Sequence, residues 1–221
     1  MTPTANLVEL VNLWHAYEKT HGTISIADFC RLYLAQQEPP SPIFDEGPEM
    51  KQKEGIPLLN RAGILFGRLT RFGLMYSKKA LTPAHLYNAL DFNFLRTLNE
   101  YESLKKSELI YLSITDFTTG IEVIKRLTKN KYAEEFPDLQ DKRSTRIKIT
   151  PVGQEILFAG LAQIKKVAPV FFGQLSEDEI YLLLRIFQKL NHYHTAIFKD
   201  VRNAEFEEIM EKFGNSELNS L

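Results

Sequence analysis

The sequence has few of the features that mark secreted or membrane proteins. It contains one cysteine, Cys30, so a disulfide within the chain is impossible, which fits a reducing compartment. No run approaches the roughly 18 apolar residues of a membrane span. The first residues lack a basic segment followed by an apolar block, so we expect no signal peptide. These absences lead us to expect a cytoplasmic protein.

The chain also has no excess of charge of either sign, because its formal net charge is -1 over 221 residues. A protein that binds acidic partners with its whole surface is therefore excluded, and any such binding would come from a local patch. The apolar share of 44% and the charged share of 25% are typical of a globular protein with a core.

No motif for catalysis or for a bound cofactor is present in the sequence. It lacks a glycine-rich phosphate loop, a nucleophile elbow and a set of zinc ligands, so we expect no enzyme activity, metal or cofactor. The pair His192 and His194 does not alter this, because helical positions i and i+2 point about 200° apart. Cys30 could be a redox switch, but its apolar neighbours Phe29 and Leu32 favour a half-buried core position.

Amphipathic helices dominate what the sequence does contain. Apolar residues spaced by three and four predict helices over 5–19, 26–36, 58–76, from Thr82-Pro83 onward, 106–112, 117–129, 151–170 and 176–201. Prolines and glycines between 37 and 57 forbid a continuous helix there and indicate a linker. We expect three parts: an N-terminal helical extension with the Pro-rich linker (1–57), a main domain (58–201) and a short C-terminal tail (202–221).

The helices over 106–112 and 117–129 are separated by a tight turn, which is the order of a DNA-reading helix-turn-helix. One side of the second helix is apolar, at Phe117, Ile121, Ile124 and Leu127. The other side offers groups that can reach base edges and phosphates, at Thr118, Glu122, Lys125 and Lys129. A charged stripe of this kind is more often only a solvated face, so the stripe alone does not decide the function.

A hairpin with a basic tip follows that helix. Residues 145–149 alternate as a strand does, with Ile147 and Ile149 expected to face inward and Arg146 and Lys148 outward. Such a tip suits the phosphate backbone or a minor groove. Over 104–149 the sequence has ten cations and seven anions, an excess of three cations in a chain whose total is -1.

Four stretches resemble MarR-type winged helix-turn-helix transcription regulators: KSELIYL (106–112), TTGIEVIKRLTKN (118–130), DKRSTRIKIT (141–150) and PVGQEIL (151–157). The likeness extends over roughly 58–200. It implies a mainly α fold, with a two-stranded β wing and long terminal dimerisation helices. The family usually has glycine where Lys131 stands, and we expect Asn130 to adopt the left-handed conformation instead.

The resemblance also implies which residues contact DNA. The recognition-helix positions are Thr118, Thr119, Glu122, Lys125 and Arg126. The wing positions are Asp141, Lys142, Arg143 and Arg146, where Asp141 braces the hairpin and orients Arg143 toward a minor groove. Ser107, at the start of the preceding helix, matches a position that touches phosphate.

The last long helix favours a homodimer, because its apolar seam is too long for one small lobe to cover. The expected interface residues are Ile180, Leu183, Phe187, Leu190, His194 and Ile197. A homodimer would read a palindromic site on double-stranded DNA, and the resemblance implies a small aromatic or anionic effector. The alternative is a dimeric winged-helix protein-interaction module without sequence-specific DNA binding. The near-neutral charge favours this alternative, and the basic wing tip opposes it.

Overall fold

The structure is a computed structural model that describes residues 3–23, 25–37, 58–138, 141 and 144–214. The chain forms two compact units, Met1–Ile56 and Pro57–Leu221, and each is described by itself. From residue 38 on, the expected proline-rich linker lies outside the described residues.

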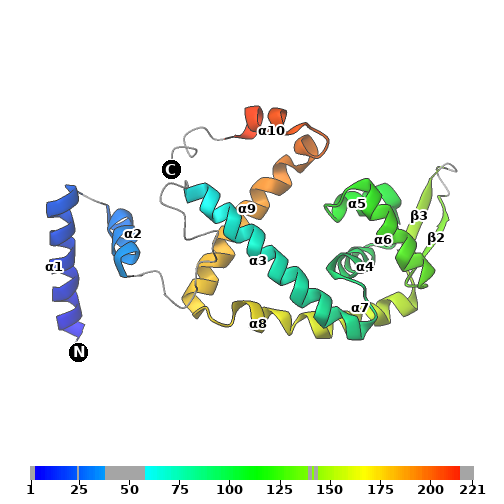
Figure 1. Cartoon of the computed structure of the whole chain (residues 1–221), viewed down its shortest axis with the longest axis horizontal. Coiled ribbons are helices and arrows are strands. Elements are labelled where there is room, and N and C mark those ends of the chain that lie inside the picture. Colours follow the sequence, from blue (N-terminus) through cyan, green and yellow to red (C-terminus); the bar gives the residue numbers. More distant parts are fainter. Residues whose placement is uncertain (1–2, 24, 38–57, 139–140, 142–143, 215–221) are drawn as a thin grey trace. The chain divides into compact units, whose positions relative to one another are not determined.

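Two helices, α1 (Pro3–His21) and α2 (Ile26–Gln37), make up the described part of the N-terminal unit (Figure 1). They are joined by an aromatic contact, because the ring of Phe29 is only 4% exposed and meets Tyr17 edge-on at 5.2 Å. Cys30 is exposed, so the expectation of a half-buried core cysteine is wrong. The next position on a helix points about 100° away from the one before it, and here that turns Cys30 away from the contact made by Phe29.

The second unit contains the remaining helices and a small sheet. The helices are α3 (Leu58–Leu81), α4 (Ala89–Glu100), α5 (Lys106–Leu112), α6 (Phe117–Lys129), α7 (Pro151–Ile164), α8 (Val167–Phe172), α9 (Glu177–Val201) and α10 (Phe206–Phe213). The strands are β1 (Leu104–Lys105), β2 (Ala133–Pro137) and β3 (Thr145–Ile149). The predicted bounds of α5 and α6 are confirmed, and the fold is mainly helical with a β wing, as expected.

The core of this unit lies mainly in one lobe, which we define as residues 89–149, and is completed by Leu81, Leu86 and α7 (Figure 1). The side chains that are almost completely buried there come from α4, α5, α6, β3 and α7: Phe94, Leu95, Leu98, Leu109, Ile110, Val123, Ile124, Leu127, Ile147 and Leu157. Burying apolar area in this way is the main stabilising contribution to folding.

The sheet has three strands in the order β1-β3-β2, and both pairings are antiparallel. Ile147 lies in the central strand, opposite Leu104 on one side and Glu135 on the other, and its side chain is fully buried as predicted. The sequence did not predict β1, because two residues are too few to show an alternating pattern.

The helix expected from Thr82-Pro83 begins later than predicted. Thr82 opens only a single 3₁₀ turn, η1 (Thr82–Ala84), and its hydroxyl donates to the carbonyl of Lys78 at 2.8 Å. Thr82 therefore finishes α3 instead of capping a new helix. The cap of α4 is Asn88, whose side-chain oxygen accepts from the backbone N–H groups of residues 90 and 91.

The helix expected over 151–170 is broken into α7 and α8, which a turn at Lys165 and Lys166 separates. Among the described residues, no single helix is long and apolar enough to cross a bilayer. Only the stretch Pro151–Phe172 taken together with α9 reaches that length and composition, and the two are bent by 110°.

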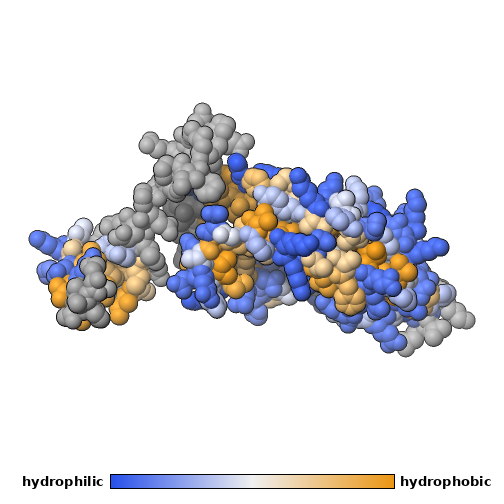
Figure 2. All heavy atoms as spheres, turned by 90° about the horizontal axis from the view of Figure 1, so that it is seen from below, coloured by the Kyte–Doolittle hydropathy of each residue, from blue (hydrophilic) through white to orange (hydrophobic). Residues whose placement is uncertain are grey.

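The long helix α9 begins at the predicted capping box, in which the backbone N–H of Ser176 donates to Glu179 at 2.6 Å. None of its residues is buried, although it is rich in leucine, isoleucine and aromatic residues. Its exposed apolar side chains include Tyr181, Leu182, Leu184, Ile186, Phe187, Leu190 and Tyr193. Figure 2 shows hydrophobic side chains on the surface of this unit. The described residues of this unit therefore leave a long apolar helix largely uncovered.

Candidate nucleic-acid interface

The turn between α5 and α6 is held by backbone hydrogen bonds. The N–H of Ser113 donates to Leu109, and the N–H of Ile114 donates to Tyr111, at 3.0 and 3.1 Å. Ile114 adopts φ = 49°, a left-handed conformation that is unusual for a β-branched residue. The helix-turn-helix is therefore closed by a strained residue.

Asp116 fixes the start of α6. Its carboxylate accepts from the backbone N–H of Thr119 at 2.8 Å, and this bond is the main reason that the pKa of Asp116 lies below its ordinary value. A helix N-terminus also stabilises a negative charge. The first turn of the recognition helix is thus anchored before any partner arrives.

The two faces of α6 differ as predicted, with one exception. The face toward the core is buried at Gly120, Val123, Ile124 and Leu127. The opposite face is exposed at Thr118, Glu122, Lys125 and Lys129, and Thr119 lies at its edge, half-buried. The exception is Phe117, which was expected on the apolar side but is 61% exposed. Phe117 is the first residue of α6, and the buried residues of this helix begin only at Gly120.

Gly120 allows α6 to cross α5 closely. A Cβ atom at this position would lie 2.5 Å from Cγ1 of Ile110, which is fully buried. Gly120 is therefore used for packing on the core side and does not belong to the exposed stripe.

Arg126 is bound inside the protein. Its Nε donates to both carboxylate oxygens of Asp91, at 3.1 and 2.9 Å, and its Nη2 also donates to this carboxylate. The guanidinium lies 4.8 Å from the ring centroid of Tyr87. The hydrogen bonds to Asp91 raise the pKa of Arg126 against the opposing effect of burial. Arg126, which was expected to contact DNA, has a partner within the protein and links α6 to α4.

Sequence reasoning missed Asp91, which is only 2% exposed. Two signals were available: it follows the cap Asn88 by three residues, and acidic side chains favour the first turn of a helix. Neither signal identifies Arg126 as its partner, because 35 positions separate the two residues.

Acidic residues organise the wing from within. Asp138, at the end of β2, is 5% exposed and lies 3.5 Å from Arg146 and 3.9 Å from Lys105. Asp141 accepts from the hydroxyl of Ser144 at 3.0 Å and lies 3.7 Å from Lys105. The bracing contacts expected of Asp141 are present, whereas Lys142 and Arg143 lie outside the described residues.

Arg146 alternates with the buried Ile147 and is half-exposed, as predicted, but its side chain is held against the protein, which the alternation did not predict. Its Nε donates to Oγ of Ser103 at 2.9 Å, and its Nη2 donates to the carbonyl of Ser103 at 2.7 Å. The cause is β1, which the sequence did not predict and which lies beside β3. The side chain therefore ties the wing to the segment before α5.

Many cations of the lobe are already paired. Ion pairs to carboxylates are made by Lys105, Lys106, Arg126, Arg146 and Lys148. Within the described part of the lobe, Lys125, Lys129 and Lys131, on the exposed side of α6 and at its exit, make no ion pair, and neither does the exposed Arg96 of α4. Three of these four unpaired cations therefore lie on α6 or directly after it.

The exit of α6 has a left-handed residue, but at Lys131 and not at Asn130. Their φ angles are 62° and -82°, so the expectation for Asn130 is wrong. The N–H of Tyr132 donates to Leu127 at 2.9 Å, a closing bond that follows the left-handed residue. The chain accepts a lysine where the family usually has glycine.

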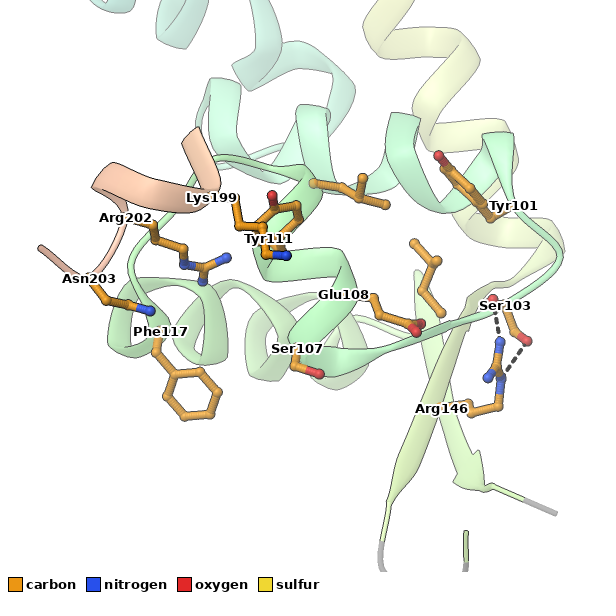
Figure 3. A pocket seen from close by; sticks show the side chains of 12 residues that line it. Tyr101, Ser103, Ser107, Glu108, Tyr111, Phe117, Arg146, Lys199, Arg202 and Asn203 are labelled. Carbon is orange, nitrogen blue, oxygen red and sulfur yellow. Dashed lines mark hydrogen bonds between the residues drawn. The ribbon is translucent and has the colours of Figure 1, made fainter. Parts of the chain in front are cut away.

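Ser107 and Phe117 border a surface cavity of about 770 Å³. Its other side is formed by the end of α9, with Lys199, Arg202 and Asn203 (Figure 3). Arg202 also lies 5.0 Å from the ring centroid of Tyr111 in α5. The end of the terminal helix therefore contacts the helix-turn-helix directly.

The residues expected at a dimer interface line α9 from end to end. Ile180, Leu183 and Ile197 are partly covered, whereas Phe187, Leu190 and His194 are exposed. All of these side chains remain accessible to a partner in the single chain.

Comparisons with known proteins agree with this geometry. A family model described as a winged helix DNA-binding domain matches residues 88–153, which hold α4, α5, α6 and the wing. A mutant MarR from E. coli complexed with operator DNA superposes with a TM-score of 0.55, covering 61% of this chain and 99% of that one at 20% identity. The chain has the MarR winged-helix fold.

Two further solved structures share this MarR fold. PcaV from Streptomyces coelicolor, in complex with its natural ligand, gives a TM-score of 0.53 and 19% identity over 63% of this chain and 98% of that one. BpsR from Bordetella bronchiseptica, whose DNA binding is regulated by 6-hydroxynicotinic acid, gives a TM-score of 0.55 and 20% identity. The match covers 59% of this chain and 98% of that one. A comparison with curated proteins finds no match.

Proposed function

We propose that this protein is a MarR-type transcription regulator that binds double-stranded DNA as a homodimer and reads a palindromic operator. The observation that carries the proposal is the division of α6 into two faces. One face is locked into the core by Val123, Ile124 and Leu127, and the other presents hydroxyl, carboxylate and ammonium groups to solvent. In a winged-helix fold this second face is the one that enters the major groove.

The charge distribution supports α6 as the main contact with DNA. Lys125, Lys129 and Lys131 have no recorded ion pair among the described residues, so they are available for phosphates or for guanine. Thr118, Thr119 and Glu122 offer further base contacts. Ser107, exposed at the start of α5, would bind a phosphate next to the groove.

In the wing we assign the DNA contacts to Lys142 and Arg143. Asp141 and Arg146 would support them from within, because both already have partners inside the hairpin or beside it. Arg143→Ala should leave stability unchanged and lower the log–log salt slope of DNA binding by about one per wing. An unchanged slope and affinity would remove Arg143 from the interface.

The homodimer is supported by surface that one chain leaves exposed. Leu182 and Leu190 of α9 are 56% and 48% exposed, and Phe66 of α3 is 65% exposed. A Cβ atom added to Gly63 or Gly67 of α3 would meet nothing within 4 Å in the single chain, so a partner helix could approach closely there. Exposed apolar side chains grouped along a helix are typical of interfaces.

The dimer can be tested by charge substitution. Leu183→Glu together with Phe187→Glu would bury carboxylates in an apolar contact and should give monomers in sedimentation. Lys189→Glu, an exposed change on the same helix, is the matched control and should stay dimeric. A stable dimer of the double variant would place the interface elsewhere.

We further propose a small aromatic anion as effector, bound in the cavity between α5 and the end of α9. Tyr111 offers an aromatic face there, and Lys199 and Arg202 offer positive charge. A ligand that binds there would act on the helix-turn-helix, because Arg202 and Tyr111 are in contact. Aromatic carboxylates, with 6-hydroxynicotinic acid among them, should release DNA from the wild type and not from Arg202→Ala.

The decisive test of the regulator is selection of operators from a random DNA pool. The proposal predicts an enriched palindrome whose half-sites are about one helical turn apart. Binding to that site should exceed binding to random duplex at the same salt concentration. A pool without enrichment, with no salt-dependent binding to any duplex, would favour the dimeric protein-interaction module instead.

A further inference from the structure

Phe117 is an apolar side chain at the start of the recognition helix that the lobe does not use for packing. It is the first residue of α6, it is 61% exposed, and it lies outside the hydrophobic core cluster. Single exposed apolar residues are common on proteins and need no function. Phe117 differs because of where it lies.

The position of Phe117 is fixed by its neighbours. The carboxylate of Asp116 accepts from Thr119 on the other side of it, at 2.8 Å, which sets the backbone at the helix start. One turn further on, Gly120 brings α6 against Ile110 of the buried core. The ring is therefore carried by a rigid element, as a residue that reads DNA requires.

Ser107 and Phe117 belong to the same surface, because both border the cavity beside α5. Figure 3 shows the hydroxyl of Ser107 and the ring of Phe117 projecting to the same side of the lobe. The first residues of a recognition helix are those that meet base edges, and Ser107 is the residue assigned to phosphate. A ring at this place would enter the major groove ahead of Lys125.

The chemistry of the major groove identifies what a phenyl ring can recognise there. Among the four bases, thymine alone presents a methyl group in this groove, and apolar side chains contact it. We propose that Phe117 reads the C5-methyl group of one thymine in each operator half-site. This inference rests on the proposed DNA-binding function and names one of its specificity-determining residues.

The test uses the operator obtained by selection and replaces each thymine of the half-site by deoxyuridine, in both half-sites at once. Deoxyuridine lacks only the methyl group, so base pairing is kept. At one position the wild type should lose affinity about fourfold for each half-site, the loss expected for one methyl group, and about fifteenfold for the palindrome. Fluorescence anisotropy at constant salt measures this loss.

The same operators are then tested with two protein variants, Phe117→Ala and Phe117→Leu. Phe117→Ala should bind the thymine operator more weakly and should make no distinction between thymine and deoxyuridine at that position. Phe117→Leu keeps an apolar side chain and should retain part of the distinction. Both variants should melt at the wild-type temperature, because the ring lies outside the core.

Two results would overturn the inference while leaving the proposed function intact. In the first, no thymine in the half-site loses affinity when its methyl group is removed. In the second, Phe117→Ala shows the same thymine preference as the wild type at every position. A selection that enriches no operator would instead contradict the proposed function itself.

Discussion

Removing Arg126 should destabilise the lobe far more than its half-exposed position suggests. Its side chain is 29% exposed, but the carboxylate it binds, that of Asp91, is 3% exposed. Arg126→Ala leaves this carboxylate buried without its partner, which costs about 3–5 kcal/mol for a fully buried pair. Since solvent can enter the space left by the guanidinium, we expect about 3 kcal/mol.

Removing the other partner, Asp91, should lower the free energy of unfolding by less than removing Arg126. Asp91→Ala leaves a guanidinium that can turn to solvent and still lies over the ring of Tyr87, 4.8 Å away. We expect about 1–2 kcal/mol for the lost hydrogen bonds. The double substitution of Asp91 and Arg126 by leucine should recover much of the loss, because an apolar pair needs no compensating charge.

Urea denaturation of the three variants measures these free energies of unfolding from the shift of the midpoint at constant m-value. Equal losses below about 1 kcal/mol for both single variants would refute the reasoning, because Asp91 would then be solvated. A second measurement addresses DNA. Arg126→Met should leave the salt slope of binding unchanged, whereas a slope lower by about one would place Arg126 on a phosphate.

Three further predictions concern the backbone around the recognition helix. Gly153→Ala should destabilise the lobe by about 2–3 kcal/mol in urea, because a Cβ atom there would overlap the carbonyl oxygen of Tyr132; wild-type stability would show that α7 can shift. Ile114→Gly should raise the free energy of unfolding by about 1 kcal/mol in the same assay, since φ = 49° is strained for isoleucine, and a loss would mean that its side chain stabilises the turn. Asp116→Ser keeps a cap without a charge, and the pKa of the Asp116 carboxyl lies below its ordinary value of 3.8. The advantage of the wild type over this variant should therefore be fully present above the ordinary pKa and be lost as the pH falls through the lower folded value. Melting curves at about pH 6 and about pH 2 check this, and an advantage that persists in acid would contradict it.

The sequence predicted those elements whose signals are local. The predicted bounds of α5 and α6 match the structure because apolar residues at helical spacing mark them, and α9 begins at its capping box. The start of α4 was misplaced because Thr82 followed by Pro83 has the pattern of a helix start, whereas the actual cap is Asn88. Only the structure shows that Thr82 bonds backward to Lys78.

Long-range partners account for most of what the sequence could not predict. Arg126 and Arg146 resemble DNA-binding cations by position, and their partners Asp91 and Ser103 lie 35 and 43 residues away. No periodicity connects positions so far apart. Phe117 was misassigned for a related reason, because a helical wheel treats the first residue of a helix like the others, although the core does not extend to it.

Whether the exposed face of α6 reads DNA sequence can be measured with the variant Lys125→Ala. Its affinity for the selected operator and for random duplex should be compared with that of the wild type at one salt concentration, with Lys165→Ala, an exposed lysine between α7 and α8, as control. If α6 reads sequence, Lys125→Ala should lose about 1–3 kcal/mol of binding free energy on the operator and less on random DNA, and the control should lose none. Equal losses on both DNAs would contradict sequence reading by α6 and assign Lys125 to phosphate contact alone.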